Sequence, residues 1–224
     1  MNLCIIPARG GSKRIPKKNI KEFCGKPLIA YSIEVAKESD LFDKIVVSTD
    51  SLEIAEVAQK YGVEVQMRPD ELSDDYAGSV DVFEYVISQN PGFEYACMIY
   101  ATAPFLQAKY LKEGFEVLKN NNVCYTFSAT TYDFPIFRGF EIEDNKAKML
   151  YPEFMNKRSQ DLPEVYHDAG QFYFKRIDCK EKFKFDGNIP IIIPRYLVQD
   201  IDTLEDFIRA EMMYKVMCAL KDKK

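Results

Sequence analysis

The chain has 224 residues and carries 30 Lys and Arg against 35 Asp and Glu, a net charge of −5 at neutral pH. This acidic balance argues against general nucleic-acid binding. No apolar run approaches the roughly 20 residues that span a bilayer, so we expect neither nucleic acid nor membrane as a partner. Hydrophobic residues make up 47% of the chain, and we expect a single domain over residues 1–224.

Targeting and redox features predict a cytoplasmic protein. The first apolar run, Leu3 to Ala8, is too short for a signal-peptide core and has no cationic leader. His167 is the only histidine, which excludes a His-rich metal site. The cysteines contain no Cys-x-x-Cys pair, so we expect six reduced thiols rather than disulfides or zinc ligands. They are Cys4, Cys24, Cys97, Cys124, Cys179 and Cys218.

The first half of the chain alternates predicted strands with predicted helices. The strands cover 3–6, 44–48, 63–67, 95–100 and 123–129, and the helices cover 28–39, 52–61, 79–89 and 108–119. Pro27 suits the first helical position, and Asp50 to Glu53 has capping-box spacing before the second helix. This alternation predicts a parallel sheet covered by helices on both faces, with ligands at the carboxyl ends of the strands.

The loop after the first strand concentrates positive charge. Between Arg9 and Lys26 there are seven Lys or Arg residues and one acid, Glu22. Gly10 and Gly11 allow a sharp turn and a close approach to a ligand. The loop matches neither the Walker nor the dinucleotide fingerprint. Its position at a strand end nevertheless favours a phosphate-rich ligand over a solvated loop without one.

The pattern changes in the second half of the chain. Residues 133–166 mix aromatic and charged side chains, and a hairpin with its turn at Asp144 and Asn145 is predicted there. The aromatic residues either pack in the core of the monomer or form an arm that is buried against a second subunit. Strands follow at 171–174 and 189–193, and an amphipathic helix at 203–220 closes the chain.

Asp200 and Asp202 flank Ile201 just before that last helix. In an extended chain their carboxylates point to the same side, and such a pair suits Mg²⁺, which completes its shell with water and phosphate oxygens. The alternative is that Asp202 or Thr203 caps the helix. A cationic phosphate loop elsewhere in the chain favours the metal site, because phosphoryl transfer needs both cations and Mg²⁺.

Two further polar segments remain open between structural and functional interpretations. The segment that starts at Arg68 is either a polar loop before the Ser79 helix or a loop that reads a base edge. His167 and Asp168 precede a strand, and such a neighbouring pair is usually a hydrogen-bonded pair. Contact with a sugar, or general-base catalysis by the histidine, are the functional alternatives.

Four motifs, in order, resemble the signatures of the nonulosonic acid cytidylyltransferases, the CMP-sialic acid synthetase group. They are Ile6 to Asn19, Val47 to Asp50, Arg68 to Leu72 and Asp200 to Thr203. The resemblance covers essentially the whole chain. Two more segments, Tyr100 to Pro104 and His167 to Tyr173, are most similar to the pseudaminic acid branch of this family.

The resemblance implies a three-layer αβα fold with a mostly parallel sheet of the nucleotide-diphospho-sugar transferase type. It also implies a small dimerisation arm, at about 133–166, in a homodimer. The reaction would join CMP from CTP to a nine-carbon α-keto acid sugar, with pseudaminic acid as the expected sugar, and release pyrophosphate. The alternatives are sialic, legionaminic or Kdo-type sugars, or a catalytically silent nucleotide-binding domain.

The resemblance also assigns roles to individual residues, with Mg²⁺ as the cofactor held by Asp200 and Asp202. The expected catalytic residues are Arg9, Lys18 and Asp202. The expected nucleotide-binding residues are Ala8, Arg9, Ser12, Lys13, Lys18, Asn19, Arg68 and Ala77, with Asn19 on the ribose and the last two on cytosine. The expected sugar-binding residues are Tyr100, Thr102, His167, Asp168, Gln171 and Tyr173.

Overall fold

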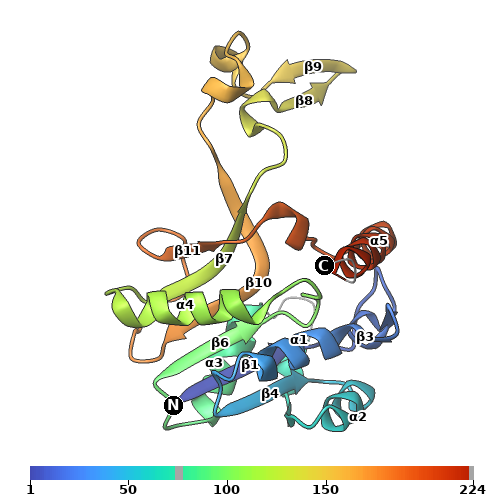
Figure 1. Ribbon diagram of the computed structural model, residues 1–224, viewed down its shortest axis with the longest axis vertical. Helices are drawn as coiled ribbons and strands as arrows, with labels where there is room; N and C mark the ends of the chain where they lie inside the picture. The colour runs from blue at the N-terminus through green and yellow to red at the C-terminus, as the bar shows by residue number, and fades with distance from the viewer. Residues whose placement is uncertain (74–77, 222–224) are drawn as a thin grey trace.

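A seven-stranded sheet in the order β11-β7-β10-β6-β1-β4-β5 forms the centre of the protein (Figure 1). This computed structural model describes residues 1–73 and 78–221. The first strand, β1, alternates its apolar side chains between two cores, with Leu3 and Ile5 on one face of the sheet and Cys4 and Ile6 on the other. The strands are β1 (Asn2–Pro7), β4 (Lys44–Thr49), β5 (Glu64–Met67), β6 (Tyr95–Ile99), β7 (Tyr125–Thr131), β10 (Tyr166–Arg176) and β11 (Ile189–Ile192).

Helices cover both faces of the sheet, which confirms the predicted three-layer αβα fold (Figure 1). One core contains apolar residues of α1, α2, α4 and α5, and the other contains those of α3. Each predicted helix lies within one residue of its observed bounds. These are α1 (Leu28–Glu38), α2 (Leu52–Lys60), α3 (Ser79–Gln89), α4 (Ala108–Asn120) and α5 (Leu204–Lys221). None of the described helices combines the length and apolarity needed to cross a membrane.

The sheet is mostly parallel, but β10 runs antiparallel to both of its neighbours, β6 and β7. The sequence predicts only a short strand at 171–174, whereas β10 begins at Tyr166 and contains a bulge between Asp168 and Tyr173. Gly170 lies in this bulge with φ of 62°, a conformation that favours glycine. The bulge explains the short prediction, because it interrupts the alternation of side chains along the strand.

A small hairpin that the sequence does not predict precedes the first helix. It pairs β2 (Glu22–Phe23) with β3 (Lys26–Pro27), and its turn contains Gly25 at φ 95°. Pro27 therefore lies in β3 and occupies the N-cap position of α1, rather than being the first helical residue.

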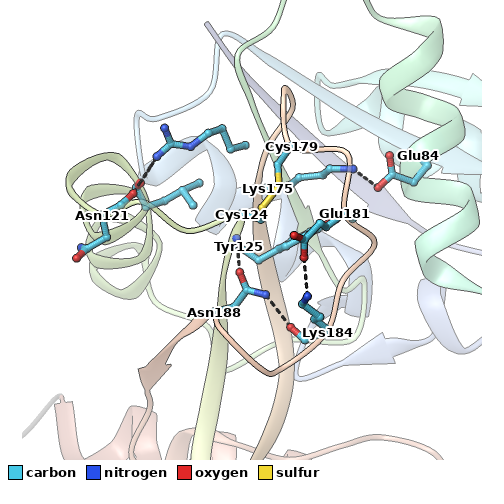
Figure 2. The surroundings of a disulfide bond; sticks show 11 residues. Glu84, Asn121, Cys124, Tyr125, Lys175, Cys179, Glu181, Lys184 and Asn188 are labelled. Carbon is cyan, nitrogen blue, oxygen red and sulfur yellow. Dashed lines mark hydrogen bonds and ion pairs between the residues drawn. A yellow bond between two sulfur atoms is a disulfide. The ribbon is translucent and has the colours of Figure 1, made fainter.

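The prediction of six reduced thiols is wrong for two cysteines. Cys124, directly before β7, and Cys179, after the end of β10, form a disulfide with their Cα atoms 5.7 Å apart (Figure 2). Their separation of 55 residues gives no local signal for this pairing. The described cysteines Cys4, Cys24, Cys97 and Cys218 are free, and burial raises the pKa of the Cys4 and Cys97 thiols, which makes both poor nucleophiles.

Residues 133–166 form an arm that projects away from the sheet beyond β7 and β10 (Figure 1). The predicted hairpin is confirmed as β8 (Phe140–Glu143) and β9 (Lys146–Met149), and both turn residues, Asp144 and Asn145, have positive φ. Within the arm, the rings of Phe137, Tyr151 and Phe154 pack on one another. Other apolar side chains of the arm remain exposed, including Phe134, Phe140, Ile142, Leu150 and Met155.

Candidate active site

Two adjoining pockets lie at the carboxyl ends of the central strands. The first, which we call the basic pocket, has a volume of about 480 Å³, and four cationic residues of the loop after β1 line it, namely Arg9, Lys13, Arg14 and Lys18. Arg68, Ala101 and Thr102 add further lining from the ends of β5 and β6. The structure therefore brings the predicted phosphate-binding residues together, as expected for loops that share one edge of a parallel sheet.

The cationic loop is held in place by the end of β4. The Gly10 N–H donates a hydrogen bond of 2.7 Å to Asp50 Oδ1. A Cβ atom on Gly10 would approach the Ser51 Cβ to 2.9 Å, so only glycine fits this close contact. The buried Asn19 side chain donates to the Arg9 carbonyl over 2.9 Å. Asn19 also lines the basic pocket, so it shapes the loop from inside the site.

The predicted capping box at Asp50 is wrong by one residue. Ser51 is the N-cap of α2, and its hydroxyl accepts the Ile54 N–H at 3.5 Å. Asp50 is instead engaged with the cationic loop, while Glu53 forms an ion pair of 2.7 Å with Lys17. Both acids at the start of α2 therefore stabilise the loop rather than the helix.

Arg68 enters the basic pocket in a fixed orientation. Its guanidinium donates to the Ser48 carbonyl at 2.6 Å and to the Leu72 carbonyl at 3.3 Å. Burial lowers the pKa of Arg68, and the nearby Asp50 carboxylate opposes that shift. The two carbonyl contacts thus fix the guanidinium in the lining of the pocket, and each of its two terminal nitrogens keeps a further donor. Ala77, the other residue predicted to contact cytosine, lies outside the described residues.

The second pocket has a volume of about 520 Å³ and receives Tyr100, His167, Asp168 and Tyr173, four of the predicted sugar-binding residues. Thr102 lies in the basic pocket instead. The structure brings Gln171 to neither pocket: its side chain is only 3% exposed and its amide donates to the Leu197 carbonyl at 2.6 Å. Gln171 holds β10 against the segment before Asp200, which is a structural role.

Asp168 is fixed on both of its oxygens. The Gly170 N–H donates to Oδ1 at 2.8 Å, and the Tyr173 hydroxyl donates to Oδ2. Burial, above all, raises the pKa of Tyr173, so this hydroxyl remains a donor. His167 contacts Asp168 as predicted, but through the backbone: its ring Nδ1 lies 2.8 Å from the Asp168 carbonyl oxygen, not from the carboxylate. The carboxylate is therefore an oriented acceptor in the second pocket.

Asp200 and Asp202 stand between the two pockets. Asp202 lines the basic pocket and pairs with Arg14 at 2.9 Å and Lys18 at 3.4 Å, whereas Asp200 lines the second pocket. The capping alternative is correct for Thr203: its hydroxyl accepts the Asp206 N–H at 3.2 Å, and Asp206 accepts the Thr203 N–H at 2.7 Å. Because Thr203 and Asp206 cap the helix, the Asp202 carboxylate is not needed for capping and can pair with Arg14 and Lys18.

The aspartate pair suits a divalent cation. Partial burial, and then the Asp202 carboxylate, raise the pKa of Asp200, while Lys18 lowers it. A cation between the two carboxylates would relieve this repulsion. The described residues contain no cluster of three or more His, Cys, Asp or Glu suited to a metal. A magnesium ion held here would therefore take most of its ligands from water and phosphate oxygens, as Mg²⁺ commonly does.

Three arginines in or near the site have functional positions that the sequence analysis does not assign. Arg14 is bound to Asp202 in the basic pocket, and Arg195 and Arg209 line the second pocket. Asp206 and Arg209 are three residues apart on α5, a spacing that places them on one face of the helix and could have indicated Arg209. Arg195 lies in a 3₁₀ turn, where no comparable spacing exists.

Comparison with known proteins identifies relatives over almost the full chain. A family model described as cytidylyltransferase matches residues 3–223. A pseudaminic acid cytidylyltransferase of Campylobacter jejuni subsp. jejuni is 48% identical and covers 96% of this chain and 97% of its own length. N-acylneuraminate cytidylyltransferase A of Danio rerio is 35% identical over 92% of this chain and 49% of its own length.

Solved structures show the same fold at low sequence identity. The structure of a CMP:2-keto-3-deoxy-manno-octonic acid synthetase complexed with CTP aligns with a TM-score of 0.73 and 14% identity, covering 96% of this chain and 99% of the other. A 4-diphosphocytidyl-2C-methyl-D-erythritol synthase from Anaerococcus prevotii aligns with a TM-score of 0.62 and 16% identity, covering 96% of each chain.

The raised pKa of Asp200 predicts a pH-dependent effect of its substitution. Because the folded pKa lies above the unfolded value, the ionised carboxyl destabilises the fold as pH rises from about 4. We expect Asp200→Asn to raise the free energy of unfolding by about 0.5 kcal/mol at pH 8, a small value because solvent screens the group. The gain should shrink toward zero near pH 4.

Urea unfolding at both pH values, without nucleotide or Mg²⁺, measures this difference. Glu113→Gln on the exposed face of α4 is the control and should show no such pH dependence. Equal destabilisation by Asp200→Asn at both pH values would instead make Asp200 a structural acceptor.

Proposed function

The chain belongs to the cytidylyltransferase family, and from this premise we propose that it transfers CMP from CTP to the anomeric hydroxyl of pseudaminic acid and releases pyrophosphate. The observation that carries the proposal is the arrangement of the two pockets. A cationic pocket of a size for a nucleotide adjoins a second polar pocket, and Asp200 and Asp202 stand where the two meet. Two substrates bound there would present their reacting groups to the aspartate pair.

The basic pocket would hold CTP. Arg9, Ser12, Lys13 and Lys18 would contact the triphosphate, which carries roughly four negative charges that cations stabilise. Asn19 would contact the ribose, and Arg68 together with Ala77 would contact cytosine. The fixed Arg68 guanidinium supports this, since it has donors left after its two carbonyl contacts.

The second pocket would hold the sugar. Asp168 would accept hydrogen bonds from hydroxyl or amide groups, and Tyr100, His167 and Tyr173 would form the walls. The anomeric hydroxyl would then attack the α-phosphorus in line while pyrophosphate leaves on the opposite side. Because the cations hold the leaving phosphates and the walls hold the sugar, positioning and electrostatics supply most of the rate. When bound, Mg²⁺ would neutralise phosphate charge beside Asp200 and Asp202.

Sequence similarity favours pseudaminic acid over sialic acid as the sugar. The pseudaminic acid cytidylyltransferase is 48% identical to this chain over nearly its whole length. The N-acylneuraminate cytidylyltransferase is 35% identical, and this chain spans about half of its length. Pseudaminic acid has an N-acyl group and a methyl group where sialic acid has hydroxyls. The second pocket offers tyrosine rings at Tyr100 and Tyr173, whose centroids lie 5.5 Å apart, and these suit such apolar groups.

A sugar panel tests this proposal. We expect pyrophosphate release with CTP to show the highest kcat/KM for pseudaminic acid, followed by legionaminic and N-acetylneuraminic acids, because polar groups left unpaired by the wrong sugar are costly. A higher kcat/KM for N-acetylneuraminic acid than for pseudaminic acid would contradict pseudaminic acid as the substrate but would leave the cytidylyltransferase activity supported. Replacement of CTP by ATP, GTP and UTP is the control for the base, and no turnover with any sugar would reject the proposal.

Magnesium binding by the aspartate pair has its own test. Asp202→Asn should lower kcat at least about 100-fold, because a lost metal ligand removes several kcal/mol of transition-state stabilisation. It should also weaken Mn²⁺ binding in the presence of CTP, as measured by electron paramagnetic resonance. Glu205→Gln, two residues into α5 and exposed, is the matched control. Near wild-type activity of Asp202→Asn across a Mg²⁺ titration contradicts the assignment.

We also propose that the arm at 133–166 joins two copies of the chain in a homodimer and that the enzyme acts in the cytoplasm. The exposed fractions of Phe134 (83%) and Ile142 (71%) support the dimer, because a projecting segment with such apolar groups gains stability from a covering partner. The arm extends away from the parent domain (Figure 1), and these side chains are exposed within one copy of the chain.

Light scattering should report a dimer of twice 25.9 kDa. The double variant Phe140→Asp/Ile142→Asp places two charges on the arm and should shift the protein toward monomer at micromolar concentration, since burying an unpaired charge costs several kcal/mol. Leu52→Asp, an equally exposed apolar position on α2, should leave the mass unchanged. A fully active wild-type monomer contradicts the role of the arm.

A further inference from the structure

We infer that Cys124 and Cys179 form a reversible thiol–disulfide site that controls the geometry of the second pocket. The inference rests on the proposed function for its kinetic test only. Both cysteines are half-buried, so small thiols can reach them. Their Cα separation of 5.7 Å lies in the range that disulfides require.

The backbone keeps the two cysteines together with or without the sulfur–sulfur bond. The Arg176 N–H donates to the Cys124 carbonyl at 3.0 Å, and the Cys179 N–H donates to the Arg176 carbonyl at 3.1 Å. β7 and β10 are paired directly beside them, with Tyr125 opposite Lys175. Reduced thiols would therefore remain neighbours, and the bond can form again without refolding of the strands.

The disulfide anchors one end of the loop at 179–188 (Figure 2). The other end is held by Asn188, whose side chain accepts the Tyr125 N–H at 2.8 Å. Between them, the Tyr125 hydroxyl donates to the Glu181 carbonyl at 2.8 Å. Reduction would leave the Asn188 contact and the backbone hydrogen bond of Cys179 in place and remove the covalent restraint on the loop that follows Cys179. The residues after Cys179, up to Phe183, would gain freedom first.

Phe183 connects this loop to the second pocket. Its ring lies edge-on to Tyr173, with the centroids 5.2 Å apart, and it also contacts the rings of Tyr125 and Phe127. Tyr173 is only 5% exposed and its hydroxyl donates to Asp168. Displacement of Phe183 would remove the packing behind Tyr173 and so loosen the orientation of Asp168, because ring contacts of this kind fix the buried side chains that share them.

The basic pocket is connected to this change only through Tyr100, whose ring centroid lies 5.5 Å from that of Tyr173. Tyr100 is the one described residue that lines both pockets, and the cationic loop is held by Asp50 and Asn19 on the far side of β6. Reduction should therefore alter sugar binding far more than CTP binding. This split separates a control site from a bond that merely stabilises the whole protein.

Formation of the disulfide requires an oxidant, and we propose glutathione disulfide for this role. The two cysteine thiols become one disulfide, while glutathione disulfide accepts the two electrons and two protons and leaves as two molecules of glutathione. Since a reducing cytoplasm keeps most thiols reduced, the bond would form there under oxidative conditions. The oxidised enzyme would have the ordered second pocket and the higher affinity for sugar.

The first measurement is structural and needs no substrate. The full-length protein is equilibrated with glutathione and glutathione disulfide at several ratios, its free thiols are alkylated, and the Cys124–Cys179 peptide is quantified by mass spectrometry. Hydrogen exchange of the two forms is then compared. Reduction should increase exchange at 179–188 and at 167–173, and leave the cationic loop at 8–20 unchanged.

The second measurement is kinetic. Reduction should raise the KM for the sugar about tenfold, as expected for loosened substrate positioning, and change the KM for CTP less than about twofold. Cys179→Ser should reproduce the reduced values at every glutathione ratio, and Phe183→Ala should reproduce them in the oxidised protein. Cys218→Ser, which alters a free and half-buried cysteine on α5, should keep the full redox response.

Either of two results overturns the inference. One is absence of the linked peptide at the most oxidising ratio. The other is a disulfide whose reduction leaves exchange at 167–173 and the KM for the sugar unchanged, or shifts the KM values for sugar and CTP equally. If no sugar on the panel is turned over, the proposed function fails and hydrogen exchange alone decides the question of the disulfide.

Discussion

Repulsion among the cations at the end of β1 is the constraint on which the rest of the site depends. Lys17, Lys18 and Arg14 lie within one short loop, and the fold neutralises them with acids from distant segments, Glu53 of α2 and Asp202 before α5. A third acid, Asp50, holds the loop backbone through Gly10. The positive charge that favours a polyphosphate ligand therefore also holds three parts of the chain together, namely the cationic loop, the start of α2 and the segment before α5.

This neutralisation determines where the two pockets meet. The Ile201 carbonyl accepts a hydrogen bond of 2.5 Å from Lys18, which holds the segment at 200–203 against the cationic loop. Thr203 and Asp206 complete the start of α5, so the helix does not compete for the Asp202 carboxylate. Asp202 consequently faces the cations and Asp200 faces the second pocket. Asp200, whose pKa burial and the neighbouring Asp202 raise, is the poorly stabilised member of the pair and would gain from a bound cation, a compromise typical of functional sites.

Local patterns in the sequence predict the elements of this fold well, because apolar periodicity and caps act over a few residues. The bounds of α3, Ser79–Gln89, follow from its sequence alone. The features that the sequence does not reveal depend on register between distant strands. The antiparallel direction of β10, the pairing of Cys124 with Cys179, and the burial of Gln171 all follow from how β10 is placed between β6 and β7. The shift of the cap from Asp50 to Ser51 likewise reflects the tertiary contact of Asp50 with Gly10.

The β7–β10 pair has the second pocket and the arm at one end and the disulfide at the other. Tyr166 pairs with Thr131 at the arm, Lys175 pairs with Tyr125 beside the disulfide, and the bulge with Asp168 lies between them. The cationic loop belongs to a different set of strands, β1 and β4. Substitutions on β7 and β10 can therefore reshape the second pocket while the cationic loop keeps its contacts. The fold thus allows one pocket to change while the other stays constant, since only Tyr100 among the described residues lines both pockets.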